Sequence, residues 1–155
     1  MLKNYIHQLL KFFYPLVSKL ILYQVYAYLA VGAANTLLNI GLFVVIYFAL
    51  ANTMLAVELA TVVSFAVTVI TGFWLNKNFA FTDAANDKAA TQKQFGKYVL
   101  VALQGQLSAY LLTKGMIVFL TMDASIAYFI TAVFMLTLNY FLQKYFTFRK
   151  KKLSI

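Results

Sequence analysis

Four long apolar stretches follow one another along the chain. They run from about Tyr26 to Leu50, Met54 to Leu75, Tyr98 to Thr121 and Ile126 to Phe146. Each is long enough for a helix that crosses a hydrocarbon core about 30 Å thick, which takes roughly 20 residues. None shows the short alternating blocks of a membrane β-barrel strand. The pattern predicts an all-α, polytopic membrane protein with four transmembrane helices.

The connections between these stretches predict two helical hairpins. Only residues 51–53 separate the first two stretches, and residues 122–125 separate the last two. Residues 76–97, between the hairpins, form a longer polar segment. We therefore expect one four-helix transmembrane domain over residues 23–155.

The first 22 residues predict a separate element. Apolar side chains recur there at helical spacing, while Lys3, His7 and Lys11 share the other face. This is typical of an amphipathic helix that lies in the membrane interface, and Pro15 is expected to bend or break it. A cleaved signal peptide fits less well, because no small-residue cleavage site follows the apolar stretch. We predict an interfacial helix over residues 1–22.

Composition supports a membrane location and excludes several classes of site. Of the 155 residues, 63% are hydrophobic and 11% are charged, whereas soluble domains are nearer half apolar and a quarter charged. The chain has no cysteine and one histidine, and its four carboxylates are scattered. No disulfide framework, metal site or nucleophilic catalytic set can be assembled from these residues. We therefore expect neither an enzyme nor a bound cofactor.

The charges predict the orientation in the membrane. The formal net charge is +9, and every basic residue except Lys114 falls in the head, in the central polar segment, or at the end of the last stretch and beyond it. The positive-inside rule then places both termini and the central segment in the cytoplasm. Because these charges flank apolar runs and do not cluster on a solvated domain, they indicate contact with lipid and not with nucleic acid.

The two hairpins end alike. GFWLNKNFAFTD at residues 72–83 aligns with NYFLQKYFTFRK at residues 139–150, with an offset of 67. YLAV from Tyr28 and YVLV from Tyr98 match more weakly near the starts of the hairpins. Each unit holds two helices, so the two units are parallel repeats with the same orientation.

These sequences carry a resemblance to a known family. VGAANTLLN (residues 31–39), SFAVTVITGFWLNKNFAF (residues 64–81) and NYFLQKYFTF (residues 139–148) resemble the GtrA-like family of small four-helix bacterial membrane proteins, over residues 26–148. The resemblance implies a flippase in the bacterial inner membrane. Its substrates would be polyprenyl-phosphate-linked sugars such as undecaprenyl-phosphate-glucose, moved to the outer leaflet for cell-surface polysaccharide modification.

Other functions remain open at this stage. Some members of the family have been proposed as membrane anchors or partners of a glycosyltransferase, without transport. A small drug exporter would need a carboxylate inside the membrane, and Glu58, the sole candidate, lies near a helix end. Because four helices make a small bundle, we also consider a homodimer.

The paired lysines are the first candidate site. Lys77 and Lys144 occupy equivalent positions at the cytoplasmic ends of the second and fourth helices. One interpretation is a pair of cations for a lipid phosphate. The other is a pair of lysines that reach the interface beside an aromatic belt.

Polar side chains form the second candidate set. Asn35 and Asn39 share one face of the first predicted helix, and amides suit sugar hydroxyls because they both donate and accept. Amides inside a membrane also bridge helices, and aromatic residues at helix ends are often belt residues. We expect a polar groove between the hairpins, lined by the polar stripe of the second helix and by Asn35, Asn39, Asn76 and Asn139. Gln143 and Trp74 are further candidates for substrate binding.

Glu58 and Lys114 are the remaining candidates. Both are expected in or near the outer half of the membrane, where a lone charge is costly. We hypothesise that they form a charged pair that gates or contacts the substrate.

Overall fold

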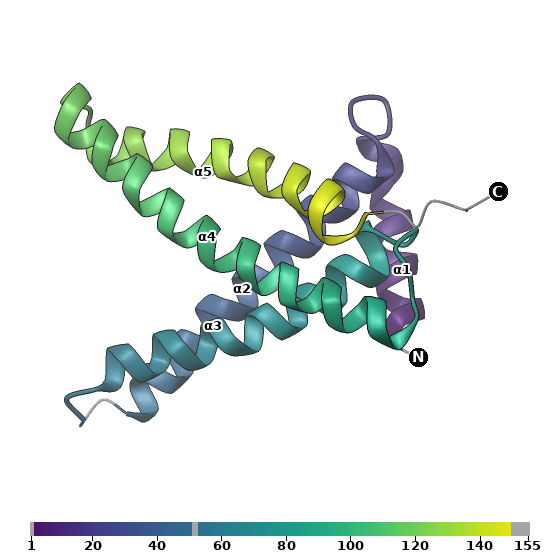
Figure 1. The fold of residues 1–155 in the computed structure, drawn as a ribbon, viewed down its shortest axis with the longest axis horizontal. Coiled ribbons are helices and arrows are strands. Elements are labelled where there is room, and N and C mark those ends of the chain that lie inside the picture. The colour runs from purple at the N-terminus through teal and green to yellow at the C-terminus, as the bar shows by residue number, and fades with distance from the viewer. Residues whose placement is uncertain (1, 51–52, 150–155) are drawn as a thin grey trace. The chain divides into compact units, whose positions relative to one another are not determined.

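The computed structural model describes residues 2–50 and 53–149, and this part of the chain is all-helical (Figure 1). It divides into two units, Met1–Thr82 and Asp83–Ile155. Unit 1 contains α1 (Leu2–Phe13), η1 (Tyr14–Leu16), α2 (Tyr23–Ala49), α3 (Ala56–Leu75) and η2 (Asn76–Ala80). Unit 2 contains α4 (Lys88–Leu120), α5 (Ala124–Leu142) and η3 (Gln143–Thr147).

Three described helices are long and apolar enough to cross a membrane. They are Tyr23–Ala49, Ala56–Ala80 and Ala124–Thr147. These coincide with the first, second and fourth predicted stretches, so the prediction of a helical membrane protein is confirmed. The third stretch, from Tyr98 to Thr121, lies within the long helix α4, which carries more polar residues. Its crossing of the membrane stays a prediction.

In unit 1, α1 docks on the hairpin that α2 and α3 form. Leu10 of α1 is buried together with Val31 of α2 and Phe79 of η2. Other apolar side chains of α1, including Tyr5 and Phe12, are exposed. The helix ends at Phe13, before the proline, as expected. A helix with one docked face and one exposed apolar face fits the membrane interface, but its location there stays a prediction.

In unit 2, two aspartates set where the helices begin. Asp87 Oδ1 accepts a hydrogen bond from the Ala90 amide at 2.8 Å, which satisfies a free donor at the start of α4. This cap starts α4 within the polar segment, well before the predicted third stretch. Thr121 adopts a left-handed conformation (φ 50°) and ends α4. Asp123 then caps α5 by accepting from the Ser125 amide at 2.9 Å.

Both hairpins end in a single π-helical turn at equivalent positions, η2 and η3. The Phe81 amide donates to the Asn76 carbonyl, and the Phe148 amide donates to the Gln143 carbonyl, both at 2.8 Å. Such turns inside helices are frequent at functional sites.

Each π-helical turn is followed by a phenylalanine that packs on a tyrosine of the first helix in its hairpin. The ring centroids of Tyr28 and Phe81 lie 6.0 Å apart, and those of Tyr98 and Phe148 lie 6.3 Å apart. The sequence repeat therefore extends to backbone geometry and to side-chain packing.

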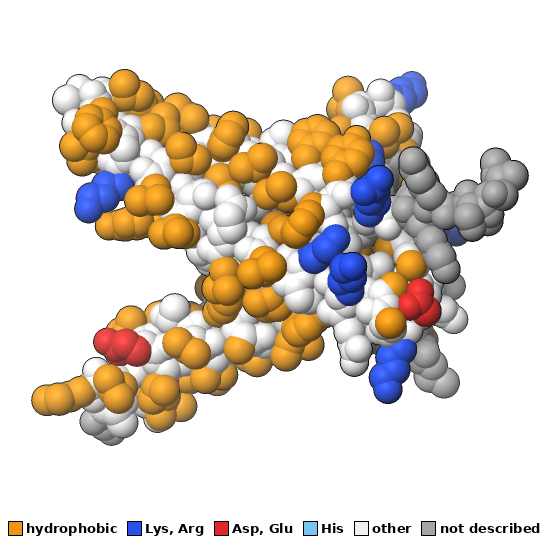
Figure 2. Space-filling view, viewed as in Figure 1, with side chains coloured by type: hydrophobic (Ala, Val, Ile, Leu, Met, Phe, Trp, Pro, Cys, Tyr) orange, Lys and Arg blue, Asp and Glu red, His pale blue; other side chains and the backbone are white. Residues whose placement is uncertain are grey.

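The charged groups of each unit lie toward its ends. In unit 1, Glu58 is in the first turn of α3, roughly 30 Å of helix before Lys77 at 1.5 Å per residue. In unit 2, basic side chains gather where α4 begins (Figure 2). The predicted cluster after the last helix is described only as far as Arg149, and Lys150 to Lys152 lie outside the described residues.

Candidate functional site

The two candidate lysines fold back along their helices. The ammonium of Lys77 lies 6.0 Å from the centroid of the Phe73 ring, one turn earlier. The ammonium of Lys144 lies 3.3 Å from the Tyr140 hydroxyl and 5.4 Å from the centroid of that ring. Phe73 and Tyr140 are equivalent in the repeat. Long helical side chains lean toward the helix N-terminus, so each cation lies nearer the middle of its helix than its own Cα.

The surroundings of Lys144 leave its charge available. Its ammonium lies near the Tyr140 hydroxyl and the rings of Tyr140 and Tyr145, the second at 5.6 Å. Ring faces attract a cation but do not neutralise it. A phosphate that approaches this helix end would meet a cation held by neutral groups.

The asparagines of α2 bridge the two helices of unit 1. Asn35 Nδ2 donates to the Thr68 carbonyl at 3.0 Å, and Asn35 Oδ1 accepts from Thr71 Oγ1 at 2.7 Å. Asn39 Nδ2 donates to Thr68 Oγ1 at 3.0 Å. Interhelical hydrogen bonds of this kind hold membrane helices together. The geometry therefore favours the packing interpretation of both asparagines.

Asn76 and Trp74 lie at the end of the same hairpin. Asn76 is 4% exposed, and its Nδ2 donates to the Gly72 carbonyl at 2.9 Å. Trp74 is 39% exposed and packs edge-on against Phe79, with the ring centroids 5.7 Å apart. Asn76 is thus tied to its own helix, and Trp74 presents part of its ring to the surroundings.

The amides of unit 2 are placed differently. The side chain of Asn139 packs on Gly105, where an added Cβ would lie 3.2 Å from Asn139 Nδ2. Asn139 Oδ1 is buried without a hydrogen-bond partner, and so is Gln143 Oε1 one turn later. Asn139 Oδ1 and Gln143 Oε1 therefore do not join α5 to α4 in the way that Asn35 and Asn39 join α2 to α3.

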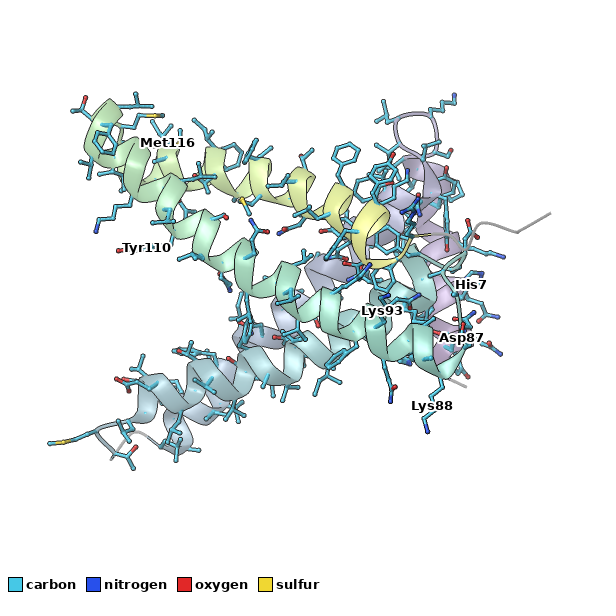
Figure 3. All side chains as sticks on the ribbon, viewed as in Figure 1. His7, Asp87, Lys88, Lys93, Tyr110 and Met116 are labelled. Carbon is cyan, nitrogen blue, oxygen red and sulfur yellow. The ribbon has the colours of Figure 1, made fainter. Side chains whose placement is uncertain are left out.

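The structure does not test the predicted pair of Glu58 and Lys114. Glu58 is exposed in unit 1. Lys114 belongs to unit 2, where its ammonium lies 3.4 Å from the hydroxyl of Tyr110, on the half of α4 nearer the turn (Figure 3). Because the two residues lie in different units, their pairing stays a prediction.

Sequence reasoning missed Lys97, Gln94 and Thr147. Lys97 Nζ donates to the Phe146 carbonyl at 3.0 Å and lies 4.5 Å from the centroid of the Phe146 ring. Gln94 and Thr147 are buried. The signal for Lys97 was its place directly before the YVLV repeat, whereas threonine and glutamine in a helix carry no comparable signal.

Comparison with known families decides the relationship of this chain. A model of the GtrA/DPMS transmembrane domain matches residues 27–148. The chain belongs to this family. Comparisons with curated proteins and with solved structures gave no match.

The GtrA/DPMS match starts in α2 and ends at the phenylalanine that closes η3. It therefore covers both repeats and leaves out α1. The family indicates a membrane function related to glycosyl lipids. The GtrA family is generally non-catalytic.

Proposed function

We propose that this GtrA/DPMS family member translocates polyprenyl-phosphate-linked sugars, such as undecaprenyl-phosphate-glucose. Movement would run from the inner to the outer leaflet of the bacterial cytoplasmic membrane, where the sugar serves cell-surface polysaccharide modification. The observation that carries the proposal is the lysine repeated at both π-helical ends, Lys77 against Phe73 and Lys144 against Tyr140.

The lysines address the main physical obstacle to this movement. A phosphodiester that leaves the head-group region loses hydration, and an anion in hydrocarbon is costly. An ammonium that leans toward the middle of its helix can contact the phosphate at the point where the phosphate begins to leave water. A charge-assisted hydrogen bond there is shorter and stronger than a neutral one. One such lysine in each repeat provides two equivalent places for this contact.

The proposed topology has four crossings, with α4 as the third and both termini cytoplasmic. The chain lacks cysteine, so single cysteines are specific probes. We expect a membrane-impermeant maleimide to label Thr53→Cys and Ser125→Cys in intact cells. Ser18→Cys and Gln92→Cys should react only after the membrane is opened. Labelling of Gln92→Cys and Ser125→Cys from the same side would show that α4 does not cross.

Reconstituted vesicles test the translocase itself. The purified chain is placed in proteoliposomes with a prenyl-phosphate-glucose analogue, and the fraction that reaches the opposite leaflet is followed with time. We expect movement well above that in protein-free vesicles. If folded protein moves none of several sugar lipids, the translocase proposal fails and the family's other suggested role, as the anchor of a glycosyltransferase, takes its place.

A further inference from the structure

Unit 2 contains a group of buried oxygen atoms that accept no hydrogen bond. They are Asn139 Oδ1, Gln143 Oε1, Thr147 Oγ1 and, from α4, Gln94 Oε1. Three of the four side chains are more than nine-tenths buried, since Gln94 is 6%, Gln143 8% and Thr147 2% exposed. Buried polar groups in proteins nearly always have a partner, and an orphan calls for an explanation.

Three of these residues share one face. Asn139, Gln143 and Thr147 follow one another at intervals of four along α5 and η3, which places them in a row. The row extends over about 12 Å at 1.5 Å per residue. Its first member packs on Gly105 of α4, so the row begins at the seam between α4 and α5.

The equivalent seam in unit 1 is bridged by hydrogen bonds between its two helices, although Asn76 Oδ1, at the position equivalent to Gln143, is also buried and accepts no hydrogen bond. With the offsets of 70 and 67 residues, Asn35 corresponds to Gly105 and Gly72 corresponds to Asn139. The amide side chain therefore lies on the first helix of the hairpin in unit 1 and on the second helix in unit 2. Asn35 bonds both Thr68 and Thr71, whereas Asn139 Oδ1 finds no donor. Asn35 and Asn39 hold the hairpin of unit 1 together, whereas Asn139 Oδ1 and Gln143 Oε1 do not serve that purpose in unit 2.

Three of the four orphan atoms are amide oxygens, which only accept, and Thr147 Oγ1 is a hydroxyl that both donates and accepts, so a matching ligand must donate hydrogen bonds. A metal cation is a poor match, because Lys97 and Lys144 already bring positive charge to η3. Asp87 and Asp123 are engaged as helix caps. A neutral group with several hydroxyls satisfies the acceptors without adding charge.

We propose that the face of α5 and η3 formed by Asn139, Gln143 and Thr147, together with Gln94 of α4, binds hydroxyl groups of the sugar. This inference rests on the proposed function and assigns sugar recognition to unit 2 alone. Because the four oxygens are buried, the helices part at the end of the hairpin that carries η3 to admit the sugar. Lys97 donates to the Phe146 carbonyl and holds that end closed, while Thr131 Oγ1, 3.7 Å from Met116 Sδ, holds the other end.

Apolar substitutions of matched shape test the site. In the double variant Gln143→Met/Thr147→Val, two unpaired acceptors are replaced by groups that need no partner. The full chain in nanodiscs is titrated with a short-chain prenyl-phosphate-glucose and with the sugar-free prenyl phosphate. We expect the double variant to unfold at a higher temperature and to lose about tenfold or more of its preference for the glucose-bearing probe. The control Thr137→Val alters an exposed α5 threonine that bonds its own helix and should leave the preference unchanged.

Two results would overturn the assignment. A lower unfolding temperature in the double variant would show that these side chains hold the fold together. An unchanged preference would show that they do not contact the sugar. The proposed function fails separately. If wild-type protein prefers the glucose-bearing probe but moves no lipid, the sugar site is supported and the translocase proposal fails. If wild-type protein moves lipid and the double variant keeps the preference, only the sugar site fails.

Discussion

Replacing Lys77 and Lys144 together by glutamine is expected to reduce lipid movement to the rate in protein-free vesicles. Glutamine keeps much of the side-chain length and a donor group but removes the charge. A hydrogen bond to a charged group contributes about 1.5–3 kcal/mol, so each loss costs roughly tenfold to a hundredfold in rate. Because each repeat supplies one lysine, the single variants should retain part of the activity and the double variant should retain none.

The matched control for the lysine variants is Lys88→Gln. Lys88 is an exposed residue of the first turn of α4, and its substitution removes a positive charge from the membrane face on which we propose that Lys77 and Lys144 also lie. Its rate should equal that of the wild type at equal protein incorporation. If the double Lys77→Gln/Lys144→Gln protein moves lipid as fast as Lys88→Gln, the two lysines only anchor their helices and do not contact the phosphate.

Replacing Asn35 by leucine is expected to destabilise unit 1. The change breaks the bonds to the Thr68 carbonyl and to the Thr71 hydroxyl at once and removes both links from Asn35 to α3. Hydrogen bonds between membrane helices contribute about 0.6–2 kcal/mol each, so the free energy of unfolding should fall by about 1–4 kcal/mol. Trp74 is the single tryptophan and lies on α3, so its fluorescence during denaturant unfolding reports this hairpin.

Thr36→Val provides the comparison for Asn35→Leu. Thr36 is exposed on the same helix, and its hydroxyl bonds the Gly32 carbonyl of that helix. Its loss should change the unfolding midpoint little. Equal stability of Asn35→Leu and wild type would show that the asparagine does not hold the helices and would return it to the candidates for substrate contact.

Much of the fold could be predicted because hydropathy and repeat structure are local signals. The apolar runs gave α2, α3 and α5, and the alignment of Lys77 with Lys144 anticipated two equivalent helix ends. The early start of α4 was not anticipated, because it depends on the Asp87 cap within a polar segment. The docking of Leu10 on Phe79 was not anticipated either. It joins residues far apart in the sequence, and no local pattern encodes that contact.

The candidate site could be predicted in its residue types but not in its bonding. Asn35 and Asn39 were placed on one face correctly, yet only the structure shows that their partners are Thr68 and Thr71. The π-helical turns had no signature in the sequence, because the same residues continue an ordinary α-helix equally well. Thr147 was missed for a similar reason, since a threonine near a helix end is common and its burial is a tertiary property.

The central claim is that a lysine at each π-helical end meets the lipid phosphate. The most direct test is photo-crosslinking with a prenyl-phosphate-glucose analogue that carries its reactive group beside the phosphate, followed by peptide mapping. We expect crosslinks within residues 73–81 and 140–148, which unlabelled prenyl phosphate suppresses and which the double Lys77→Gln/Lys144→Gln protein lacks. Crosslinks spread evenly over lipid-facing positions, and unchanged in the double variant, would contradict the claim.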